Sequence, residues 1–153
     1  MSAPLIFRCP RCGAMNRLLL LAPERQPVCG RCKVELDTAG TAAHVDLPAL
    51  EKAVAASPVP VLVDFWAPWC GPCRSFAPVL ERFAREQAGR FVVLKLDTEA
   101  NPAAGATFGI QAIPTLVAFR GGREVERVSG ALPLDELRRF AAGPRLTAPR
   151  PAP

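Results

Sequence analysis

The stretch 59–78 limits what this chain can fold into more than any other part of its 153 residues. It opens with an apolar, partly β-branched run that predicts a short buried strand, and it continues as a segment of helical periodicity. Two cysteines, Cys70 and Cys73, stand where the strand gives way to the helix. A redox-active cysteine pair needs this strand-then-helix context, so we expect the chemistry of the chain at this junction.

Three features predict that Cys70 is the reactive member of the pair. Cys70 would occupy the first helical turn, where unpaired N–H groups and the positive end of the helix dipole stabilise a thiolate. Pro72 lacks an N–H, suits a first turn and stiffens the link between the two sulfurs. Gly71 leaves no side chain beside the sulfur. We therefore expect an exposed nucleophilic Cys70 and a more buried resolving Cys73.

A Cys-x-x-Cys pair alone would also fit a metal knuckle or an inert pair of thiols, and its flanks decide between these readings. Trp69-Cys70-Gly71-Pro72-Cys73 matches the active-site motif of the thioredoxin family, and residues 61–67 match the strand that leads into it. The chain therefore resembles thioredoxins over about residues 42–143. The resemblance implies an α/β thioredoxin fold, which is a mixed central sheet with helices on both faces.

Asp64 interrupts the apolar run of the predicted strand. A carboxylate inside a buried strand is costly unless it is paired, and desolvation should raise its pKa. The residues alone are compatible with a paired, structural Asp. The resemblance implies instead that Asp64 is the family's buried acid behind Cys73 and acts as its proton acceptor, and that Lys95 is the lysine facing that acid.

Ile113-Pro114-Thr115, before another predicted strand, carries a second resemblance to the family. It is similar to the loop in which thioredoxins hold a cis proline opposite the active-site cysteines. Gly130-Ala131 is similar to the small-residue loop that completes a flat apolar patch where the substrate chain docks. The resemblance thus implies substrate binding by Trp69, Gly71, Pro72, Ile113, Pro114, Gly130 and Ala131.

The resemblance also implies a protein-disulfide reductase that needs no organic cofactor. Its partners would be disulfide-containing protein substrates and an NADPH-dependent thioredoxin reductase. Gly71-Pro72 between the cysteines matches the reducing members, whereas oxidants and isomerases of this fold usually carry a His before the second cysteine. A non-enzymatic alternative is a zinc-dependent redox-sensing or chaperone-like protein that uses the fold for partner binding.

The other four cysteines form two more Cys-x-x-Cys pairs, separated by sixteen residues: Cys9, Cys12, Cys29 and Cys32. This spacing predicts a four-cysteine zinc site, and the Pro and Gly residues within the pairs let the backbone turn tightly around a metal. About forty residues bury too little apolar surface to fold alone, so the metal would supply the missing stability. A closed Cys₄ site leaves no open position for catalysis, so we expect one structural zinc in a zinc-ribbon-like module.

Two rival interpretations of these four cysteines are weaker. Two structural disulfides are disfavoured in the reducing cytoplasm, and a second redox site lacks the strand-then-helix context of Cys70. His44 is the only histidine and has no cysteine near it in the sequence with which to bind a metal. It is therefore expected to be an ordinary strand or surface residue. The combination of both modules resembles the zinc-containing thioredoxins of bacteria, the thioredoxin 2 type.

The chain should divide into a zinc module with its linker (1–41), a thioredoxin domain (42–143) and a Pro-rich disordered tail (144–153). Within the domain, periodicity and turn residues predict helices over 47–56, 71–88, 102–108 and 133–142. They predict strands over 42–45, 59–66, 91–96, 115–120 and 124–129. Asp46 should cap the first of these helices, Gly109 should end the third, and Gly121-Gly122 should form a hairpin turn.

The net charge of +5 does not indicate a nucleic-acid partner. Residues 42–143 carry 11 basic and 11 acidic side chains, and residues 1–41 carry 6 basic and 3 acidic ones. A zinc ion held by four thiolates adds a charge of −2 to this module, and Phe7 is its only aromatic residue for stacking on bases. We therefore expect no nucleic-acid partner.

The chain is also not expected to be a membrane protein. Its longest aliphatic run, at 18–22, is far shorter than the roughly 20 residues that span a bilayer. The first residues lack the basic start and long apolar run of a secretory signal. We therefore predict a cytoplasmic location.

Overall fold

The computed structural model describes residues 4–19 and 24–147. A two-stranded antiparallel sheet, β1-β2, lies beside a five-stranded sheet in the order β3-β5-β4-β6-β7. In chain order the elements are β1 (Leu5–Arg8), β2 (Met15–Leu18), β3 (Ala43–His44), α1 (Leu47–Ala56), β4 (Val61–Trp66), α2 (Gly71–Glu86), β5 (Val92–Asp97), α3 (Pro102–Phe108), β6 (Thr115–Arg120), β7 (Arg123–Ser129), α4 (Leu134–Ala141) and α5 (Pro144–Thr147).

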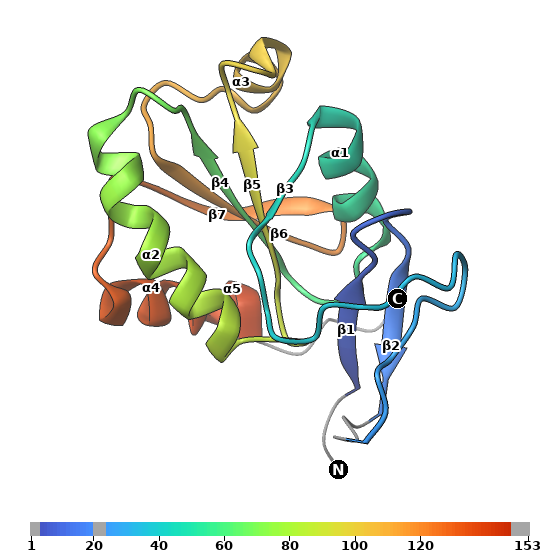
Figure 1. The fold of residues 1–153 in the computed structure, drawn as a ribbon. Coiled ribbons are helices and arrows are strands. Elements are labelled where there is room, and N and C mark those ends of the chain that lie inside the picture. Colours follow the sequence, from blue (N-terminus) through green and yellow to red (C-terminus); the bar gives the residue numbers. More distant parts are fainter. Residues whose placement is uncertain (1–3, 20–23, 148–153) are drawn as a thin grey trace.

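The large sheet is mixed and is covered on both faces, which confirms the predicted fold class. Strands β3, β5 and β4 run parallel, while β6 and β7 are antiparallel to their neighbours. Figure 1 shows α2, α4 and α5 on one side of this sheet and α1 and α3 on the other. Each side has its own hydrophobic cluster of fully buried side chains.

Strand β4 lies in the middle of the sheet and is buried along its first five residues. Val61, Val63 and Phe65 pack on the face covered by α1 and α3, whereas Leu62 packs against α2 on the other face. Side chains alternate along a strand, so Asp64 shares the α2 face with Leu62. The strand thus directs a carboxyl group toward the helix that carries the cysteine pair.

All predicted elements of the five-stranded domain form, with ends that shift by one or two residues or not at all. The Asp46 carboxylate accepts a hydrogen bond from the Ala49 N–H at 2.9 Å and caps α1, as predicted. Gly109 ends α3 with a φ of 61°, in the left-handed region that glycine adopts without strain. These local signals therefore set the helix limits.

The N-terminal module packs directly on the five-stranded domain, and its strands β1 and β2 are not among the predicted elements. The Ile6 N–H donates to the carbonyl of Gly89 at 2.8 Å, just beyond the end of α2. Phe7 and Leu36 form the centre of a small apolar cluster that Ala88 joins from the domain. These contacts join residues more than 50 positions apart. Local sequence patterns do not indicate such long-range contacts.

The linker between the two parts lies against α2. Gly40 has a φ of 87°, and a Cβ at this position would overlap the carbonyl oxygen of Ala84. Gly40 therefore lets the linker approach the helix backbone more closely than another residue would.

The prediction of a disordered tail is wrong for residues 144–147. Pro144–Thr147 forms the short helix α5, and Leu146 is only 4% exposed within the cluster that contains α2 and α4. A buried apolar side chain outweighs the Pro-rich composition that favoured disorder. The remainder of the predicted tail, 148–153, lies outside the described residues. Among the described residues, no helix is long and apolar enough to cross a membrane.

We predict that Leu146→Ala destabilises the protein by about 2–5 kcal/mol, because it removes a buried side chain and leaves a cavity. Urea denaturation followed by fluorescence measures this change. Leu19→Ala is the control, because Leu19 is 79% exposed and should change stability by less than about 0.5 kcal/mol. Equal effects of the two substitutions would show that α5 does not belong to the folded core.

Candidate functional site

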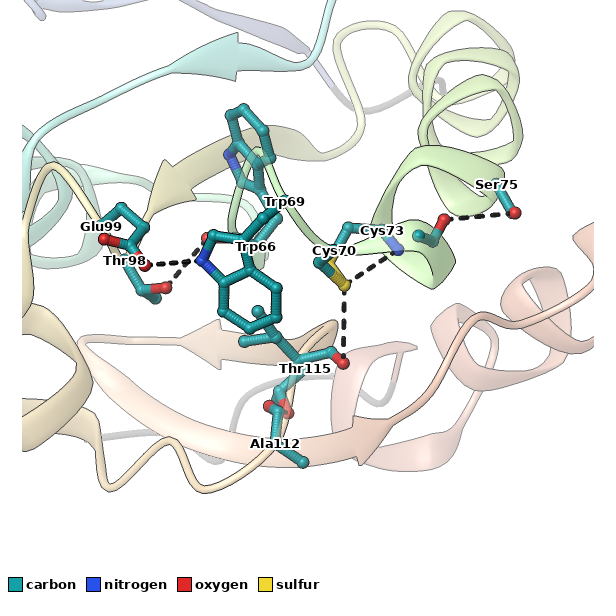
Figure 2. The surroundings of a disulfide bond; sticks show 11 residues. Trp66, Trp69, Cys70, Cys73, Ser75, Thr98, Glu99, Ala112 and Thr115 are labelled. Carbon is teal, nitrogen blue, oxygen red and sulfur yellow. Dashed lines mark hydrogen bonds between the residues drawn. A yellow bond between two sulfur atoms is a disulfide. The ribbon is translucent and has the colours of Figure 1, made fainter.

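Cys70 and Cys73 lie at the start of α2 and are joined by a disulfide, with Cα atoms 5.3 Å apart. Cys70 is the N-cap residue of the helix, and its sulfur accepts a hydrogen bond from the Cys73 N–H at 3.2 Å. The sulfur also lies 3.9 Å from the carbonyl oxygen of Ile113. Figure 2 shows the hydrogen bond between Cys73 and the Cys70 sulfur as a dashed line. A helix N-terminus that donates to sulfur stabilises a thiolate once the disulfide is reduced.

The expected difference in burial between the two cysteines is wrong for this disulfide form. Cys70 is 4% exposed and Cys73 is 3% exposed. Both pack in a small cluster with Ala67, and Trp66 and Ile113 cover its edge. The disulfide holds the two sulfurs together beneath these side chains, so a position at a helix terminus does not by itself expose Cys70.

The predicted proline loop faces the cysteine pair. The Ile113–Pro114 peptide bond is cis, as expected from the resemblance. The Gly130 N–H donates to the Pro114 carbonyl at 2.9 Å and brings the predicted Gly130-Ala131 loop to the same place. Residues from the start of α2, from the loop before β6 and from the end of β7 therefore converge on one surface.

A groove of about 220 Å³ opens beside this surface. Of the residues predicted to bind substrate, Trp69 and Ile113 line this groove, whereas the others do not: Gly71, Pro72, Pro114, Gly130 and Ala131. Instead the groove extends toward α3, along side chains and backbone that the sequence did not single out: Thr98, Gly105, Ile110, Gln111 and Ala112. Exposed Gly71, Pro72, Gly130 and Ala131 lie outside it, and Pro114 is buried.

Glu99 is a site residue that sequence reasoning missed. Trp69 is 65% exposed, and its indole N–H donates to a Glu99 carboxylate oxygen at 2.6 Å. Figure 2 shows this pair beside the disulfide. The only sequence signal is a carboxylate shortly after a buried strand, which is too common to identify a partner for a tryptophan. The hydrogen bond fixes the orientation of a large apolar surface next to Cys70.

Asp64 is fully buried, and neither of its carboxylate oxygens has a hydrogen-bond partner within the described residues. Burial raises the pKa of Asp64 to about 7, and the positive charge of Lys95 opposes part of that rise. Lys95 is the neighbour of Asp64 on the adjacent strand β5. Its ammonium lies 4.8 Å from the centre of the Trp66 ring, where a cation is attracted to the aromatic face.

The geometry of the four remaining cysteines suits a tetrahedral metal. The sulfurs of Cys9, Cys12, Cys29 and Cys32 all lie within 4.8 Å of one another, and none is in a disulfide. Two of the sulfur–sulfur distances are 3.5 and 3.6 Å. A tetrahedron with Zn–S bonds of about 2.3 Å has edges of about 3.8 Å, so these sulfurs fit a zinc ion with small adjustments.

The two knuckles of this cluster have matching backbones. Gly13 and Lys33 follow the second cysteine of each pair, have φ angles of 76° and 69°, and donate to the carbonyls of Cys9 and Cys29 at 3.0 Å. In each knuckle another N–H points at the sulfur of the first cysteine from 3.4 Å. Hydrogen bonds from the backbone lower the pKa of the Cys29 thiol, which favours the thiolate that a metal binds.

Comparison with known proteins finds a matching family model and similar sequences for the five-stranded domain. A model of the family described as Thioredoxin matches residues 41–143. The chain is 49% identical to Thioredoxin 1 of Nostoc sp. over 92 residues, which are 60% of this chain and 86% of the relative. It is 43% identical to a thioredoxin of Haemophilus influenzae over 97 residues, which are 63% of this chain and 91% of that protein.

Among solved structures, the fold is similar to that of a thioredoxin from Malassezia sympodialis (Mala s 13). The TM-score is 0.62 at 29% identity, over 70% of this chain and 94% of the other. The family match spans the five-stranded sheet and the helix that carries Cys70 and Cys73. The four-cysteine cluster lies before the matched residues.

We predict that Asp64→Asn stabilises the oxidised protein at high pH but not at low pH. Below about pH 4 the carboxyl is protonated in both the folded and the unfolded chain, so the substitution changes little. From about pH 4 to 7 only the unfolded chain ionises, so wild-type stability falls as the pH rises through this window. A pKa rise from 3.8 to about 7 corresponds to a gain of up to about 4 kcal/mol for the variant above pH 7.

Urea denaturation of both proteins at pH 4 and pH 8 measures this difference. If the stability gap is the same at the two pH values, Asp64 does not have a raised pKa in the folded chain.

Proposed function

Because the chain belongs to the thioredoxin family, we propose that it reduces the disulfide bonds of other proteins through Cys70 and Cys73. The observation that carries this proposal is the sulfur of Cys70, which caps α2 and accepts the Cys73 N–H in a disulfide-bonded pair. The relatives named Thioredoxin, about half identical over the matched residues, support a protein-disulfide reductase. The proposed partners are disulfide-containing proteins and an NADPH-dependent thioredoxin reductase.

In the first step the Cys70 thiolate attacks one sulfur of a substrate disulfide. That bond breaks, the other substrate sulfur leaves as a thiolate and takes up a proton, and Cys70 is left in a mixed disulfide with the substrate. The helix N-terminus supports this step because its N–H groups stabilise the attacking thiolate. The groove lined by Trp69 and Ile113 offers an apolar surface for the substrate backbone and side chains beside the reacting sulfur.

In the second step Cys73 loses its proton and attacks the Cys70 sulfur. The mixed disulfide breaks, the substrate leaves with its second thiol, and a Cys70–Cys73 disulfide forms, so the substrate has gained two electrons and two protons. We assign the proton acceptor to Asp64, because a carboxylate with a pKa of about 7 takes up a proton readily near neutral pH. Lys95 is the charged group that keeps this pKa from rising further.

We predict that Cys70→Ser abolishes insulin reduction by NADPH and thioredoxin reductase, lowering the rate at least about a thousandfold. Cys73→Ser should accumulate a mixed disulfide with the substrate, because the thiol that resolves it is gone. Mass spectrometry detects the trapped species, and iodoacetamide alkylation against pH gives the pKa of Cys70. Turnover by Cys70→Ser, or a Cys70 pKa equal to that of a free thiol near 8.5, would contradict the mechanism.

We further propose that Cys9, Cys12, Cys29 and Cys32 hold one structural zinc ion, which makes the chain a zinc-containing thioredoxin. The mutual sulfur distances and the N–H groups aimed at sulfur support this assignment. Four thiolates leave no open coordination position, so the ion would stabilise the module rather than take part in the disulfide chemistry. The boundaries of the zinc module at 1–41 and of the redox domain at 42–143, and a cytoplasmic location, stay predictions.

We predict that zinc stabilises the redox domain as well as the module. The two tryptophans, Trp66 and Trp69, both lie in the redox domain, so their fluorescence reports on its unfolding. With free zinc at a thousand times its dissociation constant, the free energy of unfolding should rise by about 4 kcal/mol if module and domain unfold together. A fluorescence transition that does not change when a chelator removes the metal would show that the two parts unfold independently.

Cys9→Ser separates the two roles proposed for the cysteines. This variant should lose the metal while keeping most of its insulin-reducing activity, because the cysteine pair of α2 is untouched. Loss of cellular function in Cys29→Ser but not in Cys70→Ser would instead support the redox-sensing or chaperone-like alternative.

A further inference from the structure

We infer that Lys52, on helix α1 of the redox domain, is a positioning residue for the metal of the N-terminal module. This inference rests on the zinc site proposed above. It extends that proposal by giving the redox domain a direct part in holding the metal. The group involved is the side-chain ammonium of Lys52, and its target is the backbone of the metal ligand Cys12.

The contact joins residues 40 positions apart in the sequence. Lys52 Nζ donates to the carbonyl oxygen of Cys12 at 2.8 Å. A Cβ built on the next residue, Gly13, would lie 3.5 Å from the same nitrogen and 3.8 Å from Lys52 Cδ. It would also lie 3.7 Å from a guanidinium nitrogen of Arg8. The Lys52 ammonium therefore lies against the Cys12–Gly13 peptide, and the guanidinium of Arg8 lies close to the same peptide.

The two knuckles differ in the source of the lysine that contacts their backbone. In the second knuckle, Lys33 occupies the left-handed position after the last cysteine, and its Nζ donates to the Gly30 carbonyl at 3.0 Å. In the first knuckle the same position is Gly13, which has no side chain. Each knuckle thus has one lysine on its backbone, and Lys52 is the one that serves the first knuckle.

The position of the Lys52 ammonium beside the first knuckle is electrostatically favourable. Four thiolates and one Zn²⁺ carry a charge of −2, which repels further negative charge and attracts nearby cations. A hydrogen bond to the backbone of a ligand also holds that ligand in the orientation that the metal requires. Among the described residues, no carboxylate forms an ion pair with Lys52, so the nearest partner of its ammonium is the knuckle itself.

The consequence is that α1 anchors the metal site to the redox domain. Ala53, the next residue on α1, is buried in the cluster between this helix and the sheet. Because packing fixes the helix, it also fixes the point from which the lysine reaches Cys12. The full chain should therefore bind zinc more tightly than a chain whose residue 52 cannot donate a charged hydrogen bond.

Competition for zinc against a chromophoric chelator, with the full reduced chain at low salt, measures this contribution. Lys52→Met should raise the dissociation constant for zinc about tenfold, as is usual when a partner of a metal ligand is removed. Lys52→Arg should stay within about threefold of the wild type, because it keeps a charged donor. Arg123→Met, at the exposed first residue of β7, removes the same charge elsewhere and should leave the constant unchanged.

Salt separates an electrostatic role from a purely structural one. The gap between wild type and Lys52→Met should shrink as salt screens the exposed ammonium, whereas a packing defect would persist. Insulin reduction by Lys52→Met should match the wild type, because Lys52 takes no part in the disulfide chemistry.

Three results would overturn the inference. One is a Lys52→Met constant within twofold of the wild type, and another is a loss in Lys52→Arg as large as in Lys52→Met. The third is an equal loss in Arg123→Met, which would trace the effect to net charge. If the wild type itself binds no zinc, the proposed metal site fails and this inference falls with it, whereas the first three results leave the metal site standing.

Discussion

The chemistry of this protein depends on one junction, where the central strand β4 stops and helix α2 begins. At that point the sulfur of Cys70 takes the place of a capping oxygen and accepts the Cys73 N–H. The same backbone groups that would otherwise be left unpaired at a helix N-terminus thus become the electrostatic environment of a nucleophile. The helix, the disulfide and the proline loop opposite all converge on this sulfur.

The buried carboxyl group of Asp64 is an energetically unfavourable feature that the fold tolerates. β4 is among the most buried segments of the chain, and a charge there has no hydrogen-bond partner in the described residues. Burial of this carboxyl group raises its pKa to about 7, and the positive charge of Lys95 on the neighbouring strand offsets only part of the rise. A group that titrates near neutral pH is suited to move a proton, whereas an ordinary surface carboxylate would stay ionised.

The N-terminal module is held to the redox domain at two places with different physics. Near the end of α2, backbone hydrogen bonding at Gly89 and apolar packing around Phe7 join the two parts. At α1, a charged side chain reaches the first knuckle. α2 has 16 residues, so at about 1.5 Å per residue its far end lies roughly 24 Å from the helix start. The contact at Gly89 is therefore far from the reacting sulfurs, and the apolar cluster around these sulfurs includes no described residue of the module.

The sequence by itself determined the fold class, the elements of the redox domain and the two kinds of cysteine cluster. Those features depend on local signals, such as the apolar run before Cys70, the Asp46 cap and the spacing of paired cysteines. Only the tertiary structure decided the burial of Cys70, the helix around Leu146 and the small β1-β2 sheet. It also decided two hydrogen bonds, from Trp69 to Glu99 and from Lys52 to Cys12. Most of these depend on contacts between residues far apart in the chain, or on burial by other elements, and one sequence read locally carries no signal of which distant residues will meet.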